Sequence, residues 1–510
     1  MAKNNLNGME LTKELSDELT KLMDVRRNHV SLQQLKKKSA LIDTIIQSGV
    51  RIDNEALETY RNGNMSLQIQ YDRCKISDLL KIPSLLGIEV AQQPIDNSLA
   101  TAMQATGIAQ AMSGQPNAPY GNNSGVYMSE TNCPSPGYLT RYTRLNNTNS
   151  SAIETHSRNV SSIIRTVSPN SYIYCREGTI VPTDQDLAMN SSTNPRIAVA
   201  SFSSSLCDTA SHPNYTTRDR DIDDFILYKN IPVVIAAGNR TTNCLGYYVH
   251  SLAKGLNVNT IGNFDDHSNT PSMFRMRSAS CYLDPETHNF KPEISAPGTS
   301  ITAGTDTNGT PITLTGTSQA TAHVAALLAN IASGFSDTSR FTAALARVRL
   351  LASAQNVIIY NPDGTPSSYD RAGLGGVHYS RLKNPSFYTW YEGNYHELAA
   401  NDPYPNNNAI DHLIQVGSNI SIIRLHIVWL NSGTWTYNHR SDQYPMGRRF
   451  TLYLYNPYGN YVTHATNSYA GYAHLEANLT MSGTYHVKIV LSEERDTSSI
   501  LRMAYAGYYY

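Results

Sequence analysis

Residues 315–324 of this 510-residue chain read Thr315-Gly316-Thr317-Ser318-Gln319-Ala320-Thr321-Ala322-His323-Val324. The apolar residues that follow recur at helical spacing, which predicts a buried helix beginning close to Ser318. A serine at such a helix start has a hydroxyl on a sharp turn and a backbone N–H without an intrahelical acceptor. These features suit a nucleophile that carries its own oxyanion donor. Serine is also a common N-cap, so the stretch alone leaves both interpretations open.

Two further segments accompany this serine. The first, directly upstream, is Lys291-Pro292-Glu293-Ile294-Ser295-Ala296-Pro297-Gly298. The second is Ile231-Pro232-Val233-Val234-Ile235-Ala236-Ala237-Gly238-Asn239. A buried strand that ends in Gly-Asn presents a side-chain amide at the end of a sheet, where acyl transfer needs a donor for the developing oxyanion. By itself, this ending equally fits a turn with a left-handed asparagine.

A histidine and a carboxylate lie further upstream. Thr155-His156-Ser157-Arg158-Asn159 begins a predicted helix, and a Pro-containing turn follows that helix. The apolar strand 126–128 is followed by Glu130, and no aspartate occurs between Asn97 and Thr155. Glu130 is therefore the candidate carboxylate, since Glu154 is too close in sequence to His156 to face it easily.

In their order and spacing, these segments resemble the motifs of the subtilisin-like serine proteases (subtilases). The resemblance implies that Ser318 is the nucleophile, that His156 is the general base 162 residues earlier, and that Asn239 holds the oxyanion. It implies a structural role for His323. The chain departs from the family where Gly-Thr-His should follow the catalytic histidine, and where glutamate replaces aspartate. We therefore predict a Glu130–His156–Ser318 variant of the triad.

Residues 197–203 resemble the edge strand to which the family binds extended peptides. The resemblance implies substrate contacts at Val199, Ala200, Ser201 and Gly238, through backbone hydrogen bonds along the edge. The alternative is an ordinary buried strand.

Strand-like and helix-like segments alternate between about residues 155 and 350, which predicts a mostly parallel sheet covered by helices. After about residue 385, tyrosine-rich strands separated by turn signals predict a β-sandwich with an unknown partner. The strand–helix–strand pattern of residues 66–91 resembles the family's inhibitory propeptide and implies self-cleavage between about Val90 and Ser98. The predicted divisions are 1–65, a helical extension; 66–97, the propeptide; 98–385, the catalytic domain; and 386–510, the sandwich.

Composition excludes several classes of protein. A formal net charge of −1 indicates neither nucleic-acid nor anionic-membrane binding. The chain contains no run of eighteen apolar residues, so no transmembrane helix is predicted. A low charged share of 16% is typical of proteins outside cells and favours secretion, although residues 1–8 lack the apolar core of a signal peptide.

No cofactor is expected, because acyl transfer needs no metal. The six cysteines form no CxxC pair, so no zinc site is predicted, and one or two disulfides of undetermined pairing fit the count. Subtilases often carry structural calcium, yet no loop has a convincing ligand spacing. The acidic residues of 219–224 are expected to decorate a helix start instead.

The sequence therefore predicts a serine endopeptidase that is made as a zymogen, acts on polypeptides and is inhibited by its own propeptide. An inactive pseudoprotease that binds or scaffolds is the alternative, favoured by the altered carboxylate and histidine motifs. A carbohydrate- or surface-binding protein built around the sandwich is a third.

Overall fold

The computed structural model describes residues 97–113, 120–146, 154–178, 195–200, 215–240, 247–266, 274–282, 284, 289–335, 340–354, 369–401 and 409–509. All of these residues fall within one compact unit, Asp96–Tyr510. The predicted helical extension and the propeptide up to residue 96 lie outside the described residues.

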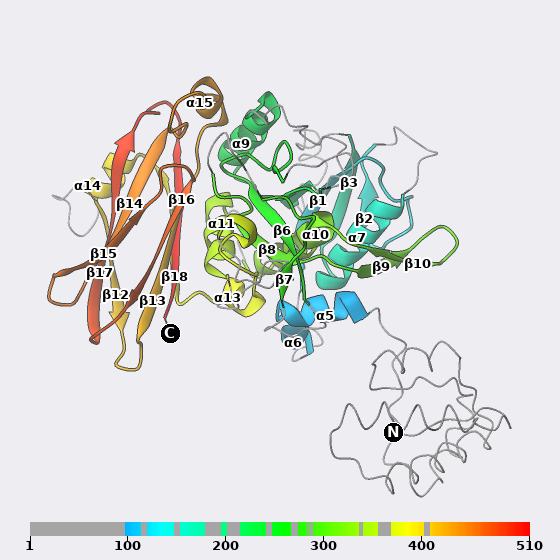
Figure 1. Ribbon diagram of the computed structural model, residues 1–510, viewed down its shortest axis with the longest axis horizontal. Coiled ribbons are helices and arrows are strands. Elements are labelled where there is room, and N and C mark those ends of the chain that lie inside the picture. Colours follow the sequence, from blue (N-terminus) through cyan, green and yellow to red (C-terminus); the bar gives the residue numbers. More distant parts are fainter. Residues whose placement is uncertain are drawn as a thin grey trace, which may run out of the picture. The chain divides into compact units, whose positions relative to one another are not determined.

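The first part of this unit is built on a mostly parallel sheet (Figure 1). Its described strands are β1 (Gly125–Glu130), β2 (Tyr142–Arg144), β3 (Tyr172–Glu177), β4 (Pro195–Ala200), β5 (Val233–Ala236), β6 (Asn259–Asp265), β7 (Arg275–Met276) and β8 (Ile294–Pro297). They lie in the order β2-β3-β1-β4-β5-β6-β7, and β8 also pairs with β6. Only β6 and β7 pair antiparallel among these strands. The predicted parallel α/β architecture is therefore confirmed.

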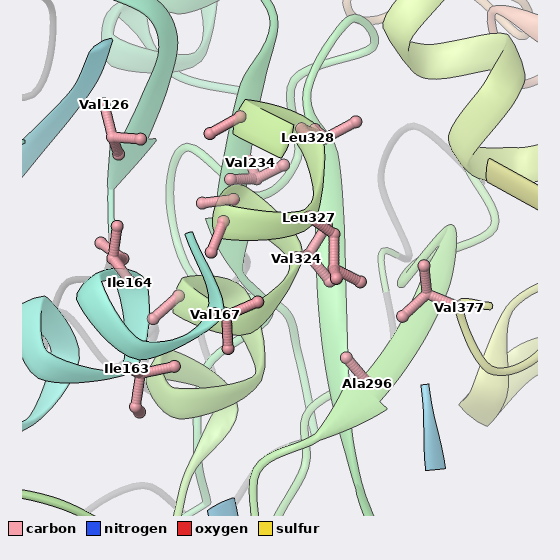
Figure 2. Packing of buried hydrophobic residues seen from close by; sticks show 14 of the residues in the cluster. Val126, Ile163, Ile164, Val167, Val234, Ala296, Val324, Leu327, Leu328 and Val377 are labelled. Carbon is pink, nitrogen blue, oxygen red and sulfur yellow. The ribbon is translucent and has the colours of Figure 1, made fainter. Parts of the chain in front are cut away.

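The helix that begins at Thr317 is the centre of the core. This helix, α10 (Thr317–Ala332), is buried along its whole length, which its many alanines permit because they let neighbouring elements approach closely. It packs against α7 (Thr155–Val167) and against strands β1, β4, β5, β6 and β8. Figure 2 shows its apolar side chains among those of the sheet and α7. The labelled residues are Val126, Ile163, Ile164, Val167, Val234, Ala296, Val324, Leu327, Leu328 and Val377.

Smaller elements complete the two faces of the sheet. The hairpin β9 (Ile301–Thr305) and β10 (Pro311–Leu314) packs on α7. The remaining described helices are α5 (Asn97–Ala105), α6 (Ile108–Ser113), α9 (Thr217–Lys229), α11 (Ala343–Ala352), α12 (Tyr369–Ala372), α13 (Tyr379–Lys383), α14 (Tyr395–Ala400) and α15 (Gly433–Asn438). No described helix is both long enough and apolar enough to cross a membrane.

Two antiparallel sheets form the C-terminal part, coloured yellow to red in Figure 1. One has the order β11-β18-β13-β16 and the other β12-β17-β14-β15. Their bounds are β11 (Phe387–Gly393), β12 (Ile410–Val416), β13 (Ile422–Trp429), β14 (Arg448–Tyr455), β15 (Tyr461–Thr466), β16 (Tyr472–Asn478), β17 (Gly483–Glu494) and β18 (Leu501–Tyr509). Alternating apolar residues of both sheets share one buried cluster, as facing sheets require.

The C-terminal sheets also pack against the α/β part. Val428 of β13 and Ala504 of β18 belong to the same buried cluster as Val348 of α11. Asn257 and Asn431 exchange hydrogen bonds through side chain and backbone across this contact. The division at 385/386 stays a prediction, and the two parts share buried apolar surface.

One structural prediction was wrong. Strand β4, expected at an edge of the sheet, is an interior strand, because it pairs in parallel with β1 on one side and β5 on the other. Over residues 198–200 the strand is paired on both sides, so the edge predicted for residues 197–203 is not found at these three residues, and residues 201–203 lie outside the described residues.

The structure pairs Cys133 with Cys175, which sequence spacing left undetermined. Cys133 follows β1 and Cys175 lies in β3, so the bridge ties the loop after β1 to the neighbouring strand. Cys281 is buried and forms no disulfide with another described cysteine.

Candidate active site

Glu130 and His156 contact each other across 26 residues of sequence. Glu130 is the last residue of β1, and His156 is the second residue of α7. Oε2 of Glu130 lies 2.9 Å from Nδ1 of His156. The glutamate side chain is 3% exposed and that of the histidine 28% exposed. A buried carboxylate at Nδ1 fixes the imidazole tautomer, so that Nε2 is the nitrogen for proton transfer.

Two opposing effects set the pKa of His156. Burial lowers it, whereas the negative charge of Glu130 and its hydrogen bond raise it. The pKa is raised overall above the ordinary value of 6.5. The physical reason is that an adjacent carboxylate stabilises the imidazolium form more than burial disfavours it. The Glu130 carboxylate thus favours the imidazolium form that His156 takes when it accepts a proton.

The loop that follows Glu130 is fastened to β3. The backbone N–H of Cys133 donates to Oε1 of Glu177, 3.1 Å away, and Arg144 forms an ion pair with the same carboxylate. Together with the disulfide to Cys175, these contacts hold the end of β1. Glu130, which has a longer side chain than the family's aspartate, is thereby attached to a backbone that is held in place.

Glu154, the other nearby carboxylate, is engaged elsewhere. It accepts hydrogen bonds from the backbone N–H and hydroxyl of Ser135, and from Nε of Arg158. The interpretation that Glu154 is too close in sequence to serve His156 agrees with this geometry.

The turn before Ser318 is built around Asn239. Oδ1 of Asn239 accepts the backbone N–H of Thr317 at 3.0 Å, and the N–H of Gly238 donates to Oγ1 of Thr317 at 3.1 Å. A Cβ placed on Gly316 would lie 3.2 Å from Nδ2 of Asn239. The asparagine side chain therefore lies against the turn, with its Nδ2 still a donor. Ser318 stands in the first turn of α10, where backbone N–H groups lack helical acceptors.

Asn159 joins the histidine helix to the serine helix. Its Nδ2 lies within hydrogen-bond distance of the carbonyls of Ile301, Ala303 and Ile312, at 3.1, 3.1 and 3.0 Å. Its Oδ1 accepts from Nε2 of Gln319 at 3.0 Å. All of these contacts are buried.

This bridge links the surroundings of the two predicted catalytic residues. Asn159 stands one turn after His156, and Gln319 directly follows Ser318. The link between Asn159 and Gln319 was not predicted from the sequence. One feature could have pointed to Asn159: it occupies the third position after the histidine, where the family usually has a histidine.

We expect Asn159→Leu to lower the free energy of unfolding by about 1–3 kcal/mol, because buried carbonyls and the Gln319 amide lose a partner. Urea unfolding in a Ser318→Ala background would measure this. Asn401→Leu is the matched control, since the Asn401 amide bonds a single carbonyl at an exposed helix end. Equal losses in both variants would show that Asn159 is not a structural bridge.

The predicted substrate-binding residues are only partly described. Gly238 has φ +104°, and a Cβ there would lie 2.2 Å from the His250 ring, so the position requires glycine. Val199 and Ala200 lie at the carboxyl end of β4, and Ser201 lies outside the described residues. The structure thus leaves their peptide contacts a prediction.

His323 and the acidic residues have packing roles. Burial lowers the pKa of His323 to about 3, and its Nε2 lies 3.0 Å from Oγ1 of Thr106. Asp219 forms a capping box with Thr216 at the start of α9. Asp224 accepts the first N–H groups of α15. Among the described residues, no three His, Cys, Asp or Glu side chains are grouped as a metal site.

A comparison with known protein families finds one match. Residues 159–375 match the model of the Subtilase family, beginning three residues after His156. The resemblance to the subtilases that the motifs indicate is thus confirmed by a family match over this part of the chain. Subtilases are serine peptidases.

Two solved structures resemble the fold. The prenylagaramide maturation protease PagA is 20% identical, with a TM-score of 0.41, over 55% of this chain and 97% of that chain. MycP1 with its N-terminal propeptide removed is 18% identical, with a TM-score of 0.39, over 56% of this chain and 96% of that chain.

Proposed function

We propose that the protein is a serine endopeptidase that uses Glu130, His156 and Ser318, with Asn239 as oxyanion donor. The observation that carries this proposal is the 2.9 Å contact between Glu130 Oε2 and His156 Nδ1. That contact joins the end of β1 to the start of α7. A serine-protease triad requires a carboxylate at this place to orient the histidine base. It supports a glutamate in the place of the family's aspartate.

The proposed reaction has two steps. His156 takes the proton of the Ser318 hydroxyl through Nε2 while the oxygen attacks the scissile carbonyl. The tetrahedral oxyanion is held by Nδ2 of Asn239 and the N–H of Ser318, and its collapse expels the amine, which takes the proton from His156. Water, deprotonated by His156, then hydrolyses the acyl-enzyme and releases Ser318.

Hydrolysis of a fluorogenic peptide library tests the activity. The purified protein should release fluorophore from a subset of peptides, and the Ser318→Ala variant should release none above background. If the native protein were as inactive as Ser318→Ala, the pseudoprotease alternative would hold. If they were equally active, another residue would be the nucleophile.

We also propose that the chain is made as a zymogen that cleaves itself. Because α5 begins at Asn97, the cut is expected in residues 90–96, before the helix. N-terminal sequencing after incubation should find a new terminus in this segment for the native protein, while Ser318→Ala stays intact. A native protein that also stays intact, while hydrolysing peptides, would contradict self-cleavage but not the peptidase activity.

Asn239→Ala should lower kcat by about 10²–10³ and leave KM nearly unchanged, because the lost donor acts on charge that develops only in the transition state. Steady-state kinetics on one peptide from the library measures both constants. A loss confined to KM would place Asn239 in ground-state binding instead.

A further inference from the structure

A cavity of about 340 Å³ opens at the end of α10 opposite to Ser318. Its walls come from α10 and the turn after it, α11, the end of α13 and β11. The lining residues are Asn330, Ile331, Gly334, Phe335, Arg340, Arg349, Lys383, Asn384, Tyr388 and Trp390. Sixteen residues of helix separate its two ends by about 24 Å, so this cavity is distinct from the candidate active site.

Among its described residues, the lining carries three basic side chains and no carboxylate. Arg349 is the most unusual of them, because the residue is only 4% exposed. Its Nη2 donates to the backbone carbonyl of Lys383, while its Nε has no hydrogen-bond partner among the described residues. A buried guanidinium is costly unless a counter-charge or a full set of acceptors accompanies it.

Aromatic rings supply part of the compensation. The Arg349 guanidinium lies 4.8 Å from the ring centre of Tyr388 and 5.6 Å from that of Phe335. Cation–π contacts of this kind offset some of the burial cost but satisfy no N–H group in the guanidinium plane. Burial lowers the pKa of Arg349 below its ordinary value. The cavity thus offers a positive charge, a donor without an acceptor and flat apolar walls.

We propose that this cavity binds a small organic oxyanion, a phosphate or carboxylate carried on an aromatic ring. The oxyanion accepts from Nε of Arg349 and from the Lys383 ammonium, and the ring packs against Tyr388 and Trp390. The volume is that of a small-molecule site. Because the walls come from both α11 and β11, an occupant also cross-links the α/β part to the C-terminal sheets and stabilises the folded chain.

Calorimetric titration of the full-length Ser318→Ala protein tests the proposal with three probes: phenyl phosphate, inorganic phosphate and phenol. Phenyl phosphate should bind saturably at one site and more tightly than inorganic phosphate, whereas phenol should not bind. Benzoate in place of phenyl phosphate distinguishes a carboxylate from a phosphate as the preferred group.

Lys383→Gln should weaken phenyl phosphate binding about tenfold or more, since a charge-assisted hydrogen bond is lost while the backbone carbonyl that Arg349 uses is kept. Arg218→Gln is the matched control, because Arg218 is exposed on α9, away from the lining. Absence of saturable binding, or equal weakening in the two variants, would overturn the proposal.

Asp337 supplies a further discriminating variant. It lies two residues after Phe335 in sequence and outside the described residues. If its carboxylate neutralised Arg349, the unmodified protein would not bind phenyl phosphate and Asp337→Asn would gain binding. That result would contradict the proposed site.

Discussion

Replacing Glu130 by glutamine should lower kcat/KM by about 10⁴-fold, the scale known for losing the carboxylate of a serine-protease triad. Glutamine keeps the length and the hydrogen-bonding capacity at His156 but loses the charge. Its amide can also donate to Nδ1 and hold the wrong tautomer, in which Nε2 carries the proton. Ser318 would then lack a base, although Asn239 and the turn amide would still bind the oxyanion.

The same substitution should move the acid limb of the pH profile. In the native protein Glu130 raises the His156 pKa above 6.5, and the neutral imidazole is the active form. Activity is therefore lost as the pH falls through a value above 6.5. Without the carboxylate, burial lowers the His156 pKa, and the acid limb of kcat/KM moves to lower pH.

Two control variants separate this role from general electrostatics. Glu154→Gln removes a carboxylate close to α7 but not in contact with His156, so its acid limb should stay in place. Glu130→Asp keeps the charge but moves it by roughly 1.5 Å, so it should lower the rate while retaining more activity than glutamine. If Glu130→Gln were as active as the native protein with an unmoved limb, another group would orient His156.

Glu293→Gln should lower the free energy of unfolding by about 3–5 kcal/mol, because it leaves two buried cations without their counter-charge. Glu293 Oε1 accepts from Lys291 at 2.6 Å and from Arg347 at 3.0 Å, and Oε2 accepts the N–H of Thr260 at 2.8 Å. All three charged side chains are fully buried. Burial already lowers the pKa of Lys291, despite the opposing effect of Glu293.

Urea unfolding in the Ser318→Ala background, which prevents self-digestion, measures this loss. Glu476→Gln serves as the control, since its ion pair with Arg424 is largely exposed and such pairs contribute about 0–1 kcal/mol. A cost for Glu293→Gln no greater than that of the control would show that the buried carboxylate is dispensable to the fold.

The sequence predicted those features that are encoded locally. The alanine-rich helix after Ser318 and the apolar runs at residues 233–236 and 258–261 each carry their own period and boundary signals. Glu130 could be proposed because no aspartate competes in the preceding segment. The contact with His156 could be anticipated because Glu130 ends a predicted strand and His156 begins a predicted helix that covers the same parallel sheet.

Other features depend on long-range pairing and could not be predicted. The position of β4 inside the sheet follows from its hydrogen bonds to β1 and β5, which a short apolar run does not specify. The partners of Glu293 include Arg347, 54 residues further along the chain. Six cysteines allow many pairings, so the Cys133–Cys175 bridge emerged only from the packing of β1 and β3.

Fluorophosphonate labelling followed by peptide mapping shows directly whether Ser318 is an activated nucleophile. Such a probe reacts with a serine only when a base activates it and an oxyanion site receives the phosphoryl oxygen. We expect a single modified residue, Ser318, with labelling abolished in His156→Ala and strongly reduced in Glu130→Gln. Modification of a different serine, or labelling that persists in His156→Ala, would contradict this expectation.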